Sequence, residues 1–158
     1  MTYEVARLMD NDVASLRELN TLFARAFEDR ETYEAQPPSD AYLRSTLARP
    51  EVTVLVARTG GVIVGGLVAY ALHKLERERS EVYIYDLAVA EEHRRRGLAT
   101  SLIESLKPIA VQQGAWVIFV QADPWDAPAM ALYTSLGVRE DVHHFDIPVT
   151  RLLGSSGS

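Results

Sequence analysis

The chain has 158 residues, a formal net charge of −6 from 16 basic and 22 acidic side chains, and no cysteine. This length suits one domain with a proper hydrophobic core. The lack of cysteine excludes a disulfide framework, a thiolate metal site and a cysteine nucleophile. An acidic chain is a poor general partner for nucleic acid but can host a cationic substrate, although the acidity can equally serve solubility alone.

No run of residues has the length and hydropathy of a membrane span, and no signal-peptide pattern is present. We therefore expect a cytoplasmic protein. Residues 1–150 are expected to form a single domain. The end of the chain, residues 151–158, is rich in Gly and Ser and is expected to be a flexible tail or a cloning remnant.

Hydrophobic periodicity predicts the elements of the first half of the chain. They are a strand (3–8), a helix (13–27), a polar loop (28–38), a short helix (40–48) and two strands (52–58 and 62–75) joined by a tight turn at Thr59-Gly60-Gly61. Two glycines between strand-forming runs are typical of a hairpin.

The second half is predicted to contain a strand that ends at residue 89, a helix (97–113), a buried apolar strand (116–121), a helix from Asp126 to Gly137 and a last strand (142–149). This order predicts an α/β (α+β) domain with one mixed, mainly antiparallel sheet and helices on both faces.

Three arginines and a glycine, Arg94, Arg95, Arg96 and Gly97, lie between the strand that ends at residue 89 and the helix that follows. A helix N-terminus carries unpaired N–H groups and a partial positive charge, so it suits a phosphate. Gly97 has no side chain to block a ligand on the backbone, and arginines form charge-assisted hydrogen bonds with phosphate oxygens. The alternatives are a solvated basic face and an ordinary turn. Neither a G-x-x-x-x-G-K-S/T nor a G-x-G-x-x-G motif is present, which makes a nucleotide triphosphatase or dinucleotide enzyme a poor candidate.

The segment YDLAVAEEHRRRGLAT (85–100) resembles the acetyl-CoA signature of the GNAT acetyltransferases, in which Arg or Gln is followed by x-x-G-x-G/A. The segment ALYTSLG (131–137) is similar to the second landmark helix of that family. The resemblance covers nearly the whole chain, and within the superfamily the aminoglycoside 3-N-acetyltransferases look most similar.

The resemblance implies a GNAT-like sheet that splays between its fourth and fifth strands, with the pantetheine arm of acetyl-CoA in the splay. Acetyl-CoA is then the co-substrate and no metal is needed. The implied cofactor-binding residues are Leu87, Ala88, Val89, Arg94, Arg95, Arg96, Gly97, Leu98, Ala99 and Thr100.

Acetyl transfer to an amine needs help with loss of the amine proton and stabilisation of the leaving thiolate. Tyr133, on the second landmark helix, is the predicted proton donor to the sulfur. By spacing alone Tyr133 also fits a core position, because it shares a helical stripe with Met130 and Leu136. The resemblance favours the catalytic role.

Asp86 is the sharpest candidate on the substrate side, as it interrupts an apolar strand just before the implied cofactor segment. It is predicted to orient the acceptor amine or help to deprotonate it. The alternative is that Asp86 faces solvent by simple alternation. In a regular strand, the neighbouring Tyr85 would point to the opposite face.

Further acidic residues are candidates for contacts with a cationic substrate: Asp146 in the predicted last strand, and Glu34, with Glu28, Asp29 and Glu31, in the loop of residues 28–38. That loop can equally be merely solvated. The adjacent His143 and His144 would point to opposite faces of a strand and so would not ligate one ion, and we predict no metal site.

These residues and the resemblance together predict an acetyl-CoA-dependent N-acetyltransferase that works by direct attack of an amine. The resemblance implies that the acceptor is the 3-amino group of aminoglycoside antibiotics and that the activity confers resistance. The expected partner is a small cationic substrate, without nucleic acid or membrane, and the family analogy suggests a homodimer. The competing hypotheses are an acetyltransferase for polyamines or protein amines and a non-catalytic acyl-CoA-binding module.

Overall fold

The structure is a computed structural model that describes residues 1–150. The described part of the chain divides into two compact units, residues 1–123 and the residues from 124 onward. The predicted tail of residues 151–158 lies outside the described residues. The helices and strands of the first unit are β1 (Glu4–Arg7), α1 (Val13–Ala26), α2 (Arg30–Glu34), α3 (Asp40–Leu47), β2 (Val52–Thr59), β3 (Val62–His73), β4 (Ser80–Val89), the short 3₁₀ helix η1 (Glu91–His93), α4 (Leu98–Gln112) and β5 (Ala115–Val120). The second unit contains α5 (Ala127–Leu136).

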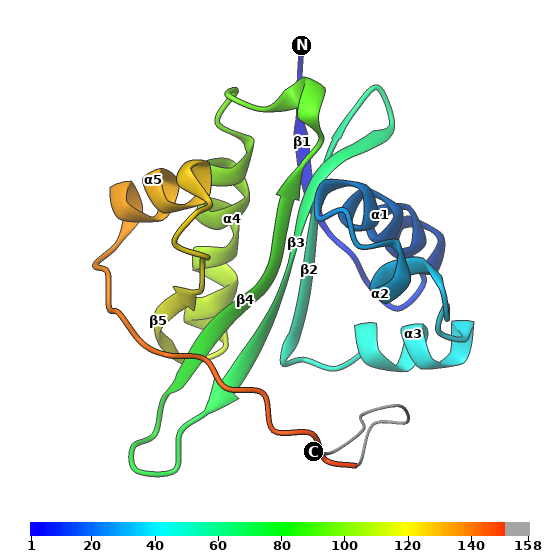
Figure 1. Ribbon diagram of the computed structural model, residues 1–158. Coiled ribbons are helices and arrows are strands. Elements are labelled where there is room, and N and C mark those ends of the chain that lie inside the picture. Colours follow the sequence, from blue (N-terminus) through cyan, green and yellow to red (C-terminus); the bar gives the residue numbers. More distant parts are fainter. Residues whose placement is uncertain (151–158) are drawn as a thin grey trace, which may run out of the picture. The chain divides into compact units, whose positions relative to one another are not determined.

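The five strands form one sheet in the order β1-β2-β3-β4-β5. Neighbours from β1 to β4 are antiparallel, and β5 pairs with β4 in parallel after the crossover through α4. Figure 1 shows α1, α2 and α3 on one side of this sheet and α4 on the other. The predicted mixed, mainly antiparallel sheet with helices on both faces is therefore confirmed.

Each face of the sheet is covered because a helix presents an apolar stripe to it. On one face, Leu19 and Phe23 of α1 are fully buried in a cluster that includes Val54 and Val56 of β2. On α4, Leu102 and Leu106 are equally buried. A fully buried Leu or Phe side chain contributes about 1.5–3 kcal/mol relative to its exposed state, so these stripes hold the helices on the sheet.

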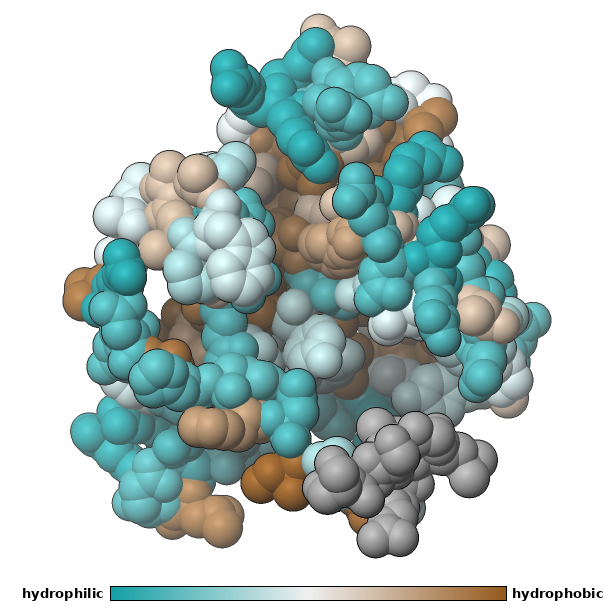
Figure 2. All heavy atoms as spheres, in the orientation of Figure 1, coloured by the Kyte–Doolittle hydropathy of each residue, from teal (hydrophilic) through white to brown (hydrophobic). Residues whose placement is uncertain are grey.

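The polar character expected of an acidic chain is visible on the surface. Figure 2 shows hydrophilic side chains over much of one face, with smaller apolar patches between them. Among the described residues, no helix is both long enough and apolar enough to cross a bilayer.

The predicted loop of residues 28–38 contains a short helix, α2, that the sequence reading missed. Asp29 caps it, because its carboxylate accepts a hydrogen bond from the Thr32 backbone N–H at 3.0 Å. Arg30 and Glu34 form an i,i+4 ion pair at 3.2 Å. Pro37 and Pro38 follow and prevent the helix from being extended.

The predicted last strand (142–149) is wrong: these residues form no strand in the structure. The alternating residues Phe145, Ile147 and Val149 are more than 80% exposed. An apolar alternation becomes a strand only when a neighbouring strand supplies hydrogen bonds, and residues 124–150 provide no backbone partner for this segment. The strand over residues 115–120 is present, but it is only partly buried, and Trp116 is 56% exposed.

Gly66 of β3 marks the closest approach of α1 to the sheet. A Cβ added there would lie 2.6 Å from Leu19 Cδ1 and 2.7 Å from the Leu55 carbonyl oxygen. The backbone oxygen cannot move aside without disturbing the β2–β3 pair, so the absence of a side chain sets the distance between helix and sheet.

We predict that Gly66→Ala lowers the free energy of unfolding by about 1–3 kcal/mol through overpacking. Gly137→Ala is the matched control, because Gly137 has an ordinary extended φ of −151° and its added Cβ would meet nothing closer than 3.8 Å. Urea denaturation of both variants measures the difference. Equal stability of the two variants would contradict the proposed close approach.

Candidate active site

The turn before α4 presents a row of backbone N–H groups. Gly97, the N-cap of α4, has a φ of 76°, and Arg95 has a φ of 62°, so both adopt the left-handed conformation. The first helical hydrogen bond runs from the Ser101 N–H to the Gly97 carbonyl at 2.9 Å, and Gly97 provides no side-chain cap. The N–H groups of Leu98, Ala99 and Thr100 therefore point out of the helix end without helical partners. Such an end is suited to a phosphate.

Exposed arginines flank this turn, and two of them are held by the body of the first unit. The Arg94 guanidinium donates from Nε to the Val89 carbonyl at 3.2 Å, which ties the turn to the end of β4. Arg96 donates from Nη1 to Tyr3 Oη at 3.3 Å, and Tyr3 Oη lies 3.0 Å from His93 Nδ1. These contacts keep positive charge beside the helix end, where it adds to the helix dipole.

The strands β4 and β5 are paired over only part of their length. Their parallel register begins at Ser80–Ala115 and ends at Ile84–Val120, whereas β4 continues to Val89. Within residues 1–123, residues 85–89 thus have β3 on one side and no strand on the other. Backbone groups along the open side are available to an extended ligand. The splay implied by the family resemblance is present at this point.

A β-bulge at Tyr85 lies at the start of the open part of β4. The β3–β4 register passes from Val68–Asp86 to Ala69–Ile84 and skips Tyr85. A bulge breaks the alternation of a strand and re-aims the side chains beside it. The Tyr85 ring contacts the Tyr70 and Tyr83 rings, and the Asp86 carboxylate helps to raise the pKa of Tyr70. Because the strand is irregular at this point, the expectation for a regular strand, with Tyr85 and Asp86 on opposite faces, does not apply.

The Asp86 carboxylate is half-buried and accepts a hydrogen bond from Tyr33 Oη of α2 at 2.8 Å. Burial raises the pKa of Asp86, and the Tyr33 hydrogen bond opposes this increase. No Lys, Arg or His forms a salt bridge with Asp86 within residues 1–150. The simple solvent-facing alternative for Asp86 is therefore wrong. A half-buried carboxylate without a cationic partner can receive a cation from outside.

Aromatic side chains surround this carboxylate. They were not predicted as site residues from the sequence. The Tyr83 ring stacks on Phe119 of β5 at 4.7 Å, and its Oη donates to Gln121 Oε1 at 3.1 Å. Burial is the main cause that raises the pKa of both Tyr70 and Tyr83. The Asp86 carboxylate raises the pKa of Tyr70 further, and Tyr85 and then Asp86 raise that of Tyr83. Phenols that remain neutral beside a carboxylate form an aromatic surface. This surface can pack against the carbon skeleton of an amine and can also interact with its positive charge.

The profile of the acetyltransferase (GNAT) family matches residues 15–138. The chain belongs to the GNAT acetyltransferase family. GNAT enzymes use acetyl-CoA, and in this member the open side of β4 and the turn of residues 94–100 provide groups of the kind that an extended pantetheine arm and a diphosphate need.

Solved structures of similar proteins agree with the GNAT assignment. An aminoglycoside acetyltransferase from an uncultured soil metagenomic sample is 54% identical, with a TM-score of 0.93 over 95% of this chain and 100% of that chain. A second aminoglycoside acetyltransferase from such a sample, solved in complex with sisomicin, is 31% identical, with a TM-score of 0.86 over 94% of this chain and 97% of that one.

A curated relative is more distant. N-acetyltransferase family 8 member 2 of Rattus norvegicus is 28% identical over 101 residues, which is 64% of this chain. This GNAT chain spans 45% of the length of that relative.

Two predicted site residues of the GNAT chain lie in the second unit. Tyr133 stands on α5, which Asp126 caps by accepting from the Ala129 N–H at 3.2 Å. Burial and then the Asp126 carboxylate raise the pKa of Tyr133 to about 12, so its phenol keeps its proton at neutral pH. Asp146 was expected on a strand, but it lies in the irregular segment after α5, where its Oδ1 is 2.8 Å from His144 Nε2.

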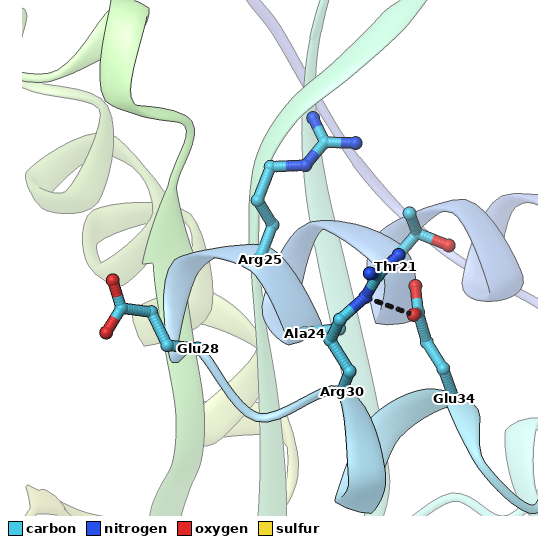
Figure 3. Close-up of a pocket in the computed structure, with 6 residues that line it drawn as sticks. All are labelled: Thr21, Ala24, Arg25, Glu28, Arg30 and Glu34. Atoms are coloured by element: carbon cyan, nitrogen blue, oxygen red, sulfur yellow. Dashed lines mark hydrogen bonds and ion pairs between the residues drawn. The ribbon is translucent and has the colours of Figure 1, made fainter.

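Glu34 lines a hollow of about 490 Å³ beside α1 and α2, together with Arg25, Glu28 and Arg30. Figure 3 shows Glu34 bonded to Arg30, while the Glu28 side chain points away from this pair. Glu34 thus has a cationic partner that a substrate ammonium would have to displace. Exposed pairs of this kind contribute less than about 1 kcal/mol, so displacement is not costly.

Residues 1–150 contain no group of three or more His, Asp or Glu side chains arranged to hold a metal ion. His143 and His144 lie in the segment without strand structure, so the predicted alternation of their side chains does not apply.

We predict that Gly97→Ala weakens coenzyme A binding about tenfold, a loss of about 1.4 kcal/mol, because a Cβ strains the left-handed φ that aims the N–H groups. Gly60→Ala is the matched control. Gly60 also has a positive φ, 56°, and open space around its Cα, but it lies in the β2–β3 turn. Isothermal titration with coenzyme A measures the affinity of both variants. Equal losses of affinity in both would show that general destabilisation, and not the turn, is responsible.

Proposed function

We propose that the protein is an acetyl-CoA-dependent N-acetyltransferase that modifies aminoglycosides at the 3-amino group of the deoxystreptamine ring. The proposal rests mainly on the Asp86 carboxylate. This carboxylate is half-buried at the open part of β4, and no basic side chain among residues 1–150 forms an ion pair with it. The 54% identity to an aminoglycoside acetyltransferase and the net charge of −6 support a polycationic substrate.

Acetyl-CoA would supply the activated acetyl thioester. Arg94, Arg95, Arg96 and the N–H groups of Gly97, Leu98, Ala99 and Thr100 would hold its diphosphate. Leu87, Ala88 and Val89 would pair with its pantetheine arm through their backbone, and an N–H in this stretch would polarise the thioester carbonyl.

Asp86 would bind the acceptor ammonium and orient its nitrogen toward the thioester carbon. An alkylammonium has a pKa of about 10.4, so even a carboxylate of raised pKa is a weak base for it. Binding and orientation are therefore the larger part of its role. The bound ammonium must lose one proton, to Asp86 or through it to water, before its nitrogen has the lone pair that attacks the thioester carbon. The raised pKa of Asp86 narrows the difference from the pKa of the ammonium and favours this transfer.

Tyr133 would donate its phenolic proton to the departing sulfur as the C–S bond breaks. A pKa of about 12 keeps this phenol protonated before the transfer. The amine nitrogen attacks directly, so no side chain carries the acetyl group. Asp146 and Glu34 would contact further ammonium groups of the substrate. Cytoplasmic location, a homodimer and a role in antibiotic resistance stay predictions.

A thiol-release assay with acetyl-CoA tests the proposal against its competitors. Gentamicin and sisomicin are expected to release thiol, whereas spermidine and a lysine peptide are not. Turnover of the peptide or of spermidine alone would identify a different acceptor class. Coenzyme A binding without turnover of any amine would indicate a non-catalytic module, and mass and NMR analysis of the product would identify the acetylated nitrogen.

We predict that Asp86→Asn lowers kcat/KM for gentamicin about a hundredfold or more. In the wild type, activity falls as the pH drops through the raised pKa of Asp86, because only the ionised carboxylate holds the ammonium. The acid limb of the pH profile should disappear in the variant. Asp10→Asn, which changes an exposed carboxylate before α1, is the control. A wild-type profile in Asp86→Asn would remove this residue from the mechanism.

We predict that Tyr133→Phe lowers kcat about tenfold or more while the Kd for acetyl-CoA changes less than about threefold, because only the proton donor is lost. Steady-state kinetics and isothermal titration separate the two effects. Unchanged turnover would make Tyr133 a packing residue and not an acid.

A further inference from the structure

We infer that Tyr33 is a positioning residue that fixes the Asp86 carboxylate for the acceptor amine and so links helix α2 to the chemistry. The inference rests on the proposed function and deepens it. Its basis is the 2.8 Å hydrogen bond from Tyr33 Oη to Asp86 Oδ1, which connects two elements 53 residues apart in the chain.

Tyr33 is held firmly enough to act in this way. Its ring lies 5.9 Å from the Phe23 ring and 5.7 Å from the Phe27 ring, and Phe23 is fully buried in the core. The Asp29 cap fixes the start of α2. A phenol anchored on the core offers a hydrogen-bond donor at a defined place, which a flexible exposed side chain would not.

The bond occupies one carboxylate oxygen and leaves the other for the substrate. Among the described residues, the Tyr33 hydroxyl is the one side-chain donor to Asp86. Without it, the carboxylate could rotate about its Cβ–Cγ bond, since this torsion has broad minima. With it, the plane of the carboxylate is set, and Oδ2 accepts no side-chain hydrogen bond from the described residues and is open to an ammonium. Small errors in the direction of attack lower the reaction rate strongly. Fixing the position of this oxygen is therefore important for turnover.

The ionisable groups around the pair are acids and phenols. Tyr70 comes from β3, Tyr83 and Tyr85 from β4, Asp29 precedes α2, and Tyr42 of α3 lies near Tyr70. The pKa of Tyr33 is raised by burial first and then by its bond to Asp86, so the phenol stays a donor. In the described part of the chain, burial and the Tyr33 bond are the influences that shift the pKa of Asp86, in opposite directions.

The test is Tyr33→Phe, which removes the hydroxyl and keeps the ring against Phe23 and Phe27. Loss of a donor to the charged carboxylate should raise the pKa of Asp86, so the acid limb of kcat/KM for gentamicin should move up by about half to one pH unit. At its optimum pH, kcat should fall about fivefold to fiftyfold, as expected for a mispositioned group. Tyr42→Phe is the matched control, because Tyr42 is 62% exposed and gives no hydrogen bond to Asp86.

A second measurement does not need turnover. NMR titration of the full chain with isotope-labelled aspartate follows the Asp86 carboxyl directly, with Asp86→Asn to assign its signal. The midpoint should be higher by the same amount in Tyr33→Phe and unchanged in Tyr42→Phe.

The outcomes separate the two proposals. An unchanged midpoint in Tyr33→Phe overturns the inference, and so does a shifted midpoint with wild-type kcat and pH profile. If the wild type acetylates no aminoglycoside, the proposed function fails, and the NMR titration still decides whether Tyr33 controls Asp86.

Discussion

The site depends on one constraint, the early end of the β4–β5 pairing. Because β5 ends at Val120, opposite Ile84, while β4 continues to Val89, the end of β4 has backbone groups that the sheet of residues 1–123 does not use. The bulge at Tyr85 lies at the same point and brings Asp86 to Tyr33 and the tyrosines around it. Where the pairing of β4 and β5 stops, hydrogen bonds between the two strands are lost. A bound ligand can form hydrogen bonds with the freed backbone groups in their place. The turn of residues 94–97, which we propose holds the diphosphate of the cofactor, follows this strand after the short helix η1.

The two ends of the open strand segment are chemically opposite. At one end, the N-terminus of α4 and three arginines offer positive charge and N–H donors to an anion. At the other end, Asp86 and the surrounding phenols offer a half-buried acceptor to a cation. A ligand with a diphosphate, extended along β4, would carry its far end toward Asp86. This difference in charge along a single strand is the physical basis of our proposal that an anionic acyl donor and a cationic acceptor bind at the same site.

Much of the fold could be predicted from local signals. The helices α1 and α4 with their periodic stripes, the short helix α3 and the glycine turn between β2 and β3 lie where the sequence indicated. Helix α2 was missed because it is only five residues long and owes its existence to a cap and to the contacts of Tyr33. The strand expected over residues 142–149 failed for the opposite reason. Its alternation was real, but alternation cannot supply a hydrogen-bonding neighbour.

The sequence by itself determined the family, the positive turn at residues 94–97 and the singular position of Asp86, because each depends on the order of neighbouring residues. Only the tertiary structure decided the partner of Asp86, the direction of its side chain and the length of the open part of β4. These depend on strand register and on contacts between residues far apart in the chain, such as Tyr33 and Asp86. One skipped residue in a register reverses the face of every residue that follows, and no local pattern records it.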